Sequence, residues 1–167
     1  MITSKPVRII LIVLTGFLFY SAGYFRNYIF LFLNAEAFAV WYHRPIISPP
    51  AFLGFVSTLG YPALVRLKWA FTFLFYILFF LLALAAVSLF FRQRIYLWLC
   101  SVVYAGLLLI SFMFMISGYL FHGFAIHAYN ISRSLIHIGQ SPFLPMLLLI
   151  TIYYHRHAYS AENRQKI

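Results

Sequence analysis

The chain has 167 residues, of which 65% are hydrophobic and only 8% are charged. A mean hydropathy of +0.94 excludes an ordinary soluble domain, and the 22% of aromatic residues suits membrane helices with rings at the interfaces. The formal net charge of +10 comes without a nucleic-acid-binding motif, so anionic lipid headgroups, and not nucleic acid, are the expected partners. The single cysteine excludes an intrachain disulfide.

The first expected element is a membrane helix over residues 7–24. Its basic start, apolar stretch and small residues at 21–23 resemble a signal peptide. Apolar sequence resumes at residue 28, however, so we expect an uncleaved helix. Arg26 and Asn27 interrupt it, and residues 28–41 are too short to span alone, which makes them either an extension or an interfacial helix.

A proline-rich break follows. Pro45, Pro49, Pro50 and Gly54 oppose a regular helix although the segment stays apolar. We therefore expect residues 28–60 to form a segment that is interfacial, or partly re-entrant if protein or water covers its backbone.

Three further spans are expected at residues 62–91, 95–121 and 128–154. A tight basic turn at 92–94 joins the first two, and a bend is expected in the last between Gly139 and Pro145. Residues 156–167 form a polar tail. The predicted fold is all-α: a polytopic membrane protein with one domain over residues 1–155, a four-transmembrane-helix bundle and an outer Pro-rich interfacial segment.

Four spans place both termini on one side of the membrane. That side collects seven basic residues: Lys5, Arg8, Arg92, Arg94, Arg156, Arg164 and Lys166. The opposite side holds five: Arg26, Arg44, Arg66, Lys68 and Arg133. Because cytoplasmic loops carry the excess of Lys and Arg, both termini are predicted to be cytoplasmic.

Polar residues in membrane segments are costly, and five of them define the predicted binding site at the outer face: Arg26, Glu36, Asn130, Arg133 and His137. The last three are spaced i, i+3 and i+7 and so share one helix face. Arg133 could clamp a carboxylate or phosphate by a two-pronged hydrogen bond. Alternatively, Arg133 pairs with Glu36 while Asn130 fixes helix packing.

Arg66 and Lys68 stand at the start of a span, where such side chains usually anchor to lipid headgroups. His122, His127 and His137 raise the question of haem or a metal. A haem needs two histidines on different helices at similar depth, whereas two of these precede the helix that carries the third. We therefore expect interfacial histidines, with no metal and no cofactor.

Cys100-Ser101, Asn130-x-x-Arg133 and a later histidine follow the residue order of the exosortase and archaeosortase transpeptidases, which the chain resembles in this respect. Val102 replaces the glycine expected after Cys-Ser. Cys100 should lie about 9 Å from the cytoplasmic end of its helix, and Arg133 on the order of 15–20 Å away across the membrane. No catalytic residues are therefore assigned.

The basic N-terminus, the Pro-rich outer segment and the run Tyr129-Asn-Ile-Ser-Arg133 through Gln140-Ser-Pro-Phe-Leu-Pro145 resemble small exosortase-associated membrane proteins. The resemblance implies a bacterial inner-membrane protein that accompanies a transpeptidase in surface-protein sorting.

The expected function is thus a non-enzymatic accessory subunit that binds an anionic lipid or a peptide of another integral membrane protein. The alternative is a small membrane enzyme acting on a lipid-linked or peptide substrate, with His137 or His127 as base and Arg133 as anion clamp. A transporter ranks third, because four spans without an inverted repeat would need oligomers.

Overall fold

The computed structural model describes residues 5–43, 51–91 and 93–165, and every regular element within these ranges is helical. The chain divides into two compact units, Met1–Phe75 and Tyr76–Ile167, which are described separately. The segment around Pro45, Pro49 and Pro50, expected to be irregular, lies outside the described residues.

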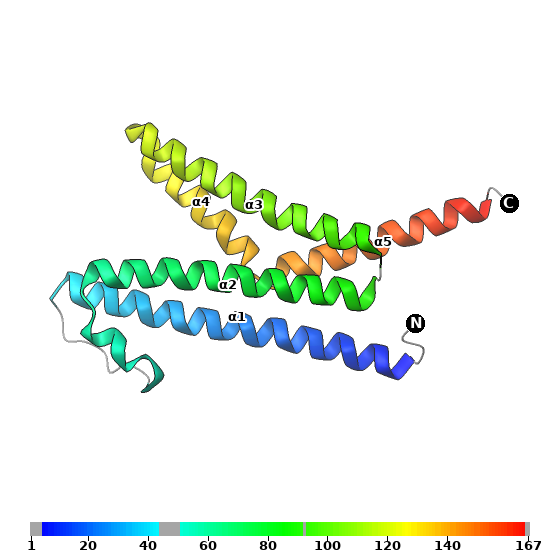
Figure 1. Ribbon diagram of the computed structural model, residues 1–167, viewed down its shortest axis with the longest axis horizontal. Helices are drawn as coiled ribbons and strands as arrows, with labels where there is room; N and C mark the ends of the chain where they lie inside the picture. Colours follow the sequence, from blue (N-terminus) through cyan, green and yellow to red (C-terminus); the bar gives the residue numbers. More distant parts are fainter. Residues whose placement is uncertain (1–4, 44–50, 92, 166–167) are drawn as a thin grey trace. The chain divides into compact units, whose positions relative to one another are not determined.

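The first unit begins with α1 (Lys5–Trp41), one continuous helix of 37 residues (Figure 1). It passes through Arg26 and Asn27, where the sequence led us to expect an interruption. Neither residue type breaks a helix as proline does, so local propensity allows this continuity. Residues 28–41 therefore extend the first helix, which at about 55 Å is longer than the hydrocarbon core of a bilayer. Beyond α1, His43 has a φ of 51°, a left-handed conformation common where helices end.

A short 3₁₀ helix, η1 (Ala51–Thr58), follows in the first unit. It buries Leu53 and Val56, which lie three residues apart and so on one side of a three-residue turn. Phe52 and Phe55, also three apart, are about half exposed. The buried side of η1 joins α1 and the start of α2 (Tyr61–Phe90) in one apolar cluster. Its buried members are Ile29, Phe32, Leu33, Ala37, Leu53, Val56, Leu64 and Phe75.

In the second unit, two buried tyrosines join the rest of α2 to α3 (Arg94–Leu120). The Tyr76 hydroxyl donates to the Tyr104 carbonyl oxygen at 2.6 Å, and their rings meet edge to face. The Tyr104 hydroxyl donates to the Phe79 carbonyl oxygen at 3.4 Å. Both hydroxyls are thus satisfied inside an apolar contact, which removes the cost of burying them.

Small residues bring α3 against α4 (Ala125–Gly139), with η2 (His122–Phe124) as the connection (Figure 1). Ser111 and Gly118 of α3 and Ala128 and Ser132 of α4 are all buried. The Ser111 hydroxyl donates to the Ser132 carbonyl oxygen at 2.8 Å. Membrane helices commonly pack in this way, because small side chains let two backbones approach closely.

A break at residues 140–142 separates α4 from α5 (Phe143–Gln165), and the two helix axes differ by 61°. Pro142, which lacks a backbone N–H, lies in the break, within the region where we expected a bend. Gln140 in the break is buried. The polar tail expected from residue 156 is helical as far as Gln165.

Three helical segments within the described ranges are long and apolar enough to cross a membrane: Ile9–Trp41, Tyr61–Phe90 and Arg94–Leu120. The bent pair of α4 and α5 makes a fourth span if it crosses as one segment. The predicted all-α class and multi-pass membrane character are thereby confirmed.

Candidate functional site

Arg26 is held by its own helix. It is 8% exposed, its Nη1 donates to the Asn27 side-chain oxygen at 2.9 Å, and its guanidinium carbon lies 5.3 Å from the centre of the Phe30 ring. A cation over an aromatic face is stabilised by the ring quadrupole. These contacts give Arg26 a structural role within α1, and α1 needs no break to accommodate it.

Glu36 is completely buried, and neither of its carboxyl oxygens has a hydrogen-bond partner among the described residues. It lies ten residues after Arg26, about 15 Å further along α1, so the two do not form one pocket on that helix. Leu33, about one turn before Glu36, and Ala37, the next residue, both belong to the apolar cluster.

The two expected headgroup anchors stand near the start of α2. Arg66 is exposed, and its Nε donates to the Pro62 carbonyl oxygen at 3.4 Å, one turn nearer the helix start. Lys68 is half-buried. A long cationic side chain near the end of a helix can place its charge among lipid headgroups. Headgroup anchoring by Arg66 and Lys68 therefore stays a prediction.

In the second unit, Asn130, Arg133 and His137 are all exposed on α4, opposite its buried face. Arg133 Nε donates to His137 Nε2 at 3.4 Å. This contact joins residues one helical turn apart, as the i, i+4 spacing requires. The Nε2 lone pair of His137 therefore faces a cation, and the remaining guanidinium nitrogens of Arg133 lie on an exposed side chain.

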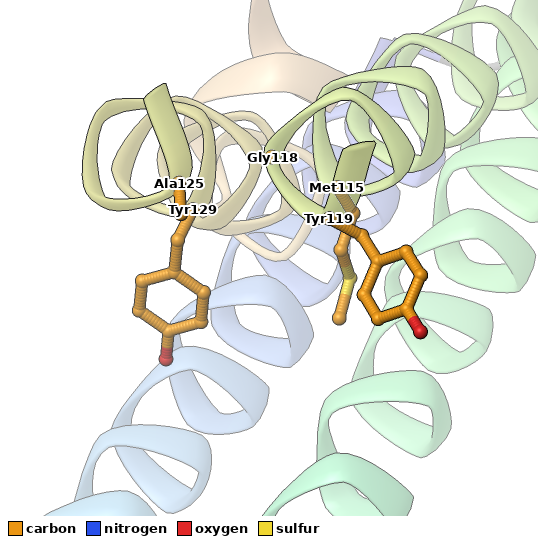
Figure 2. A pocket seen from close by; sticks show the side chains of 5 residues that line it. All are labelled: Met115, Gly118, Tyr119, Ala125 and Tyr129. Atoms are coloured by element: carbon orange, nitrogen blue, oxygen red, sulfur yellow. The ribbon is translucent and has the colours of Figure 1, made fainter. Parts of the chain in front are cut away.

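An open apolar groove of about 350 Å³ lies between α3 and α4 near their η2 end. Met115, Gly118 and Tyr119 contribute from α3, and Ala125 and Tyr129 from α4. Figure 2 shows the side chains of Met115, Tyr119 and Tyr129 extending toward the same side of the hairpin, with the two phenol rings flanking the gap. The glycine and the alanine form its floor because they add little side chain.

The groove and the polar face of α4 adjoin. Tyr129, which lines the groove, precedes Arg133 by four residues, so the two side chains are neighbours on the helix surface. Arg133 thus lies one turn from an apolar groove with two phenol hydroxyls at its edge, and its guanidinium contacts His137 on the side away from that groove. This arrangement can hold a molecule that has an anionic head and an apolar chain.

The transpeptidase-like trio does not assemble. Ser111 of α3 contacts Ser132 of α4, next to Arg133, whereas Cys100 lies eleven residues from Ser111, about 16 Å along α3. Cys100 is also fully buried. His127 is exposed with its ring 6.2 Å from that of Phe124, and the side chain of His122 is not among those described. No three His, Cys, Asp or Glu residues in the described part of the chain are placed to hold a metal ion.

Comparison of the chain with protein-family models, with curated proteins and with solved structures gives no match. The function is therefore inferred from the geometry within each of the two units.

Of the five predicted site residues, Arg26 and Glu36 lie in the first unit and the other three in the second. The groove beside Arg133 was not predicted from the sequence. Its signal was present in the small residues at the α3–η2–α4 turn, Gly118, Ala125 and Ala128, which allow close packing. That signal locates a helix contact, but the gap between the two tyrosines depends on side-chain direction and needs the structure.

Proposed function

We propose that this multi-pass membrane protein is a non-catalytic subunit that binds an anionic membrane lipid on its α3–α4 hairpin. The observation that carries the proposal is the exposed Arg133–His137 pair one helical turn from the groove of Met115, Tyr119 and Tyr129. Arg133 binds the phosphate, Asn130 adds a hydrogen bond, and the groove takes an apolar part of the lipid. A phosphate is favoured because an exposed guanidinium offers paired donors that match its oxygens.

The proposed setting is the bacterial inner membrane, with both termini in the cytoplasm and the hairpin turn on the outer side. The excess of basic residues on the terminal side supports the orientation. The resemblance of residues 129–145 to exosortase-associated proteins supports an accessory role in a protein-sorting or envelope complex. Lipid binding would then position the subunit, or present the lipid to its partner.

Lipid retention measured by native mass spectrometry tests this proposal. Protein released from nanodiscs of phosphatidylglycerol and phosphatidylcholine should keep phosphatidylglycerol preferentially. Arg133→Gln should reduce that retention about 10-fold, since a hydrogen bond to a charged group contributes roughly 1.5–3 kcal/mol. Tyr129→Ala should reduce retention of both lipids, because it removes apolar surface from the groove.

Arg66→Gln is the matched control, because Arg66 is also exposed and its Nε already donates to the Pro62 carbonyl oxygen. It should change phosphatidylglycerol retention much less than Arg133→Gln. Equal retention by Arg133→Gln and the parent protein would refute the lipid site. Loss of a co-purifying protein from Arg133→Gln, with phosphatidylglycerol unchanged, would instead identify the occupant as a partner peptide.

A further inference from the structure

The carboxyl group of Glu36 lies in surroundings unlike those of the proposed lipid site. It is 0% exposed, on the face of α1 that contributes Leu33 and Ala37 to the apolar cluster. Every buried member of that cluster is apolar, so none offers a side-chain donor. Both carboxyl oxygens are without a hydrogen-bond partner in the described part of the chain.

The chemistry of the site restricts what can neutralise this carboxyl group. An ionised carboxylate buried without a counter-ion carries a large desolvation cost. Calcium or magnesium needs six or more oxygen ligands, and the cluster supplies no second oxygen side chain. No three His, Cys, Asp or Glu residues in the described ranges are placed to hold any other metal ion. A cationic side chain of another protein cannot reach atoms that have no exposed surface. A proton meets none of these objections.

We propose that Glu36 is a proton-binding site, a carboxylic acid that stays neutral inside the α1–η1–α2 cluster of the folded protein. Loss of the proton places a bare charge beside Leu33 and Ala37 and loosens the apolar cluster to which Leu53 and Val56 attach η1. The site is independent of lipid binding on the α3–α4 hairpin.

The charged and titratable groups of the neighbouring elements are placed consistently with this assignment. On α1, Arg26 is about 15 Å away along the helix, and the exposed His43, just past the end of α1, follows Glu36 by seven residues, about 10 Å. The described part of η1 has no charged residue. On α2, Arg66 is exposed and Lys68 is half-buried, and neither donates a hydrogen bond to Glu36. Arg44 lies outside the described residues and is therefore included in the test.

A proton has a short route to this site. Glu36 precedes Trp41 by five residues, about 7.5 Å along α1. The Trp41 ring lies 4.7 Å from that of Tyr61, and such aromatic pairs are typical of the membrane–water interface. Exchange with water can therefore take place from that end of the helix without a path across the whole bilayer.

Infrared spectroscopy of the intact protein, exchanged from lipid into a detergent without ester groups, provides a direct measurement. The chain has only two acidic side chains, Glu36 and Glu162, so the carbonyl band of a protonated carboxylic acid is easily assigned. At neutral pH we expect this band in the parent protein and in Glu162→Gln. It should be abolished in Glu36→Gln. Its absence from the parent protein would overturn the proposal.

Chemical modification gives a second readout that needs no spectroscopic assignment. The apolar reagent dicyclohexylcarbodiimide, which attacks protonated carboxyl groups in membranes, should modify Glu36 in the parent protein during transient local openings of the cluster. Glu36→Gln should not be modified, while its phosphatidylglycerol retention stays unchanged. An ionised Glu36 paired with Arg44 would give the opposite result: no modification in the parent, and modification only in Arg44→Gln.

Thermal unfolding shows the linkage to stability. A proton bound more tightly by the folded protein makes stability fall as pH rises. The Tm of the parent should therefore fall, relative to that of Glu36→Gln, as the pH rises above the range in which a glutamic acid in the unfolded chain loses its proton. If the parent and Glu36→Gln have the same pH dependence, folding does not favour the protonated form and the proposal fails.

Discussion

Gly118 shows how much of the α3–α4 contact depends on a single residue. A Cβ atom at this position would lie 2.9 Å from the Cβ of Ala128 and 3.4 Å from the backbone of Ala125. The nearer distance is well inside normal van der Waals separation, and the atoms it would meet belong to short or rigid groups that cannot rotate away. The glycine is thus required by packing, since its φ is not positive.

Gly118→Ala should therefore lower the free energy of unfolding by about 1–3 kcal/mol, the usual cost of overpacking. Gly106→Ala in the same helix is the matched control, because a Cβ there meets no atom within 4 Å. It should be neutral or stabilising by up to about 1 kcal/mol, since alanine favours a helix over glycine. Unfolding in mixed detergent micelles measures both, and equal effects of the two substitutions would contradict the close approach of α3 and α4.

Individual polar residues were only partly interpretable from the sequence. The cost of a charge in a membrane helix indicated Arg26 and Glu36 correctly as unusual. Arg26, however, is occupied by Asn27 and by the ring of Phe30 one turn away. The complete burial of Glu36 could be seen only in the structure, because it depends on packing between segments distant in sequence.

At the scale of elements, α4 ends against a tyrosine of α2. A Cβ on Gly139 would collide with the ring of Tyr76, whose hydroxyl donates to the Tyr104 carbonyl oxygen of α3. Three helices of the second unit therefore meet at Tyr76, immediately before the break that separates α4 from α5. The packing of Gly139 on this ring places the end of α4.

Gly139→Ala should displace the Tyr76 ring and lower the free energy of unfolding by about 1–3 kcal/mol. Tyr76→Phe should lower it by about 1 kcal/mol, because only the hydrogen bond to Tyr104 is lost. The double variant should be less destabilised than the sum of the two, since both act on the same ring. Strict additivity in unfolding experiments would show that Gly139 and Tyr76 are not coupled.

Hydropathy, together with residues that typically begin or end helices, predicted the ends of α2 and α3. α2 and α3 begin and end within one residue of the expected ranges 62–91 and 95–121. Tyr61-Pro62 and the basic turn at 92–94 provide strong local signals there. The end of the first helix was less predictable, because Arg26 and Asn27 are polar and yet compatible with a helix. The polar side chains of Arg26 and Asn27 indicated an interruption, but the backbone stays helical there, as the helix propensities of these residues allow.

For the whole molecule, the long continuous apolar runs predict the all-α membrane class, because a helix satisfies its backbone hydrogen bonds within each run, whereas membrane strands are short and alternate apolar with polar residues. Composition does not determine how the segments are oriented across the bilayer. The 27 residues of α3 extend about 40 Å, enough to cross the hydrocarbon core. Gln93 at its start and η2 at its end should therefore emerge on opposite sides.

Cysteine labelling tests this topology in a variant that has no native cysteine. Cys100 is the single cysteine, and it is fully buried. Cys100→Ala therefore gives a protein without a native thiol. Gly123→Cys in η2 should fold normally, because a Cβ there meets no atom within 4 Å. Gln93→Cys places a second thiol in the basic turn. A membrane-impermeant maleimide should label Gly123→Cys in intact cells, and Gln93→Cys only after the cells are opened.

Labelling of the two thiols shows separately whether α3 spans the membrane and which of its ends lies outside. Labelling of both thiols from the outside would show that α3 does not cross the membrane, whatever its hydropathy. Labelling of Gln93→Cys alone from the outside would keep the span and reverse the orientation inferred from the basic residues. Reversal would also move the Arg133 region to the cytoplasmic leaflet, where anionic lipids and nearby basic residues attract each other. A lipid site on α4 would survive that result, whereas a role at the outer face would not.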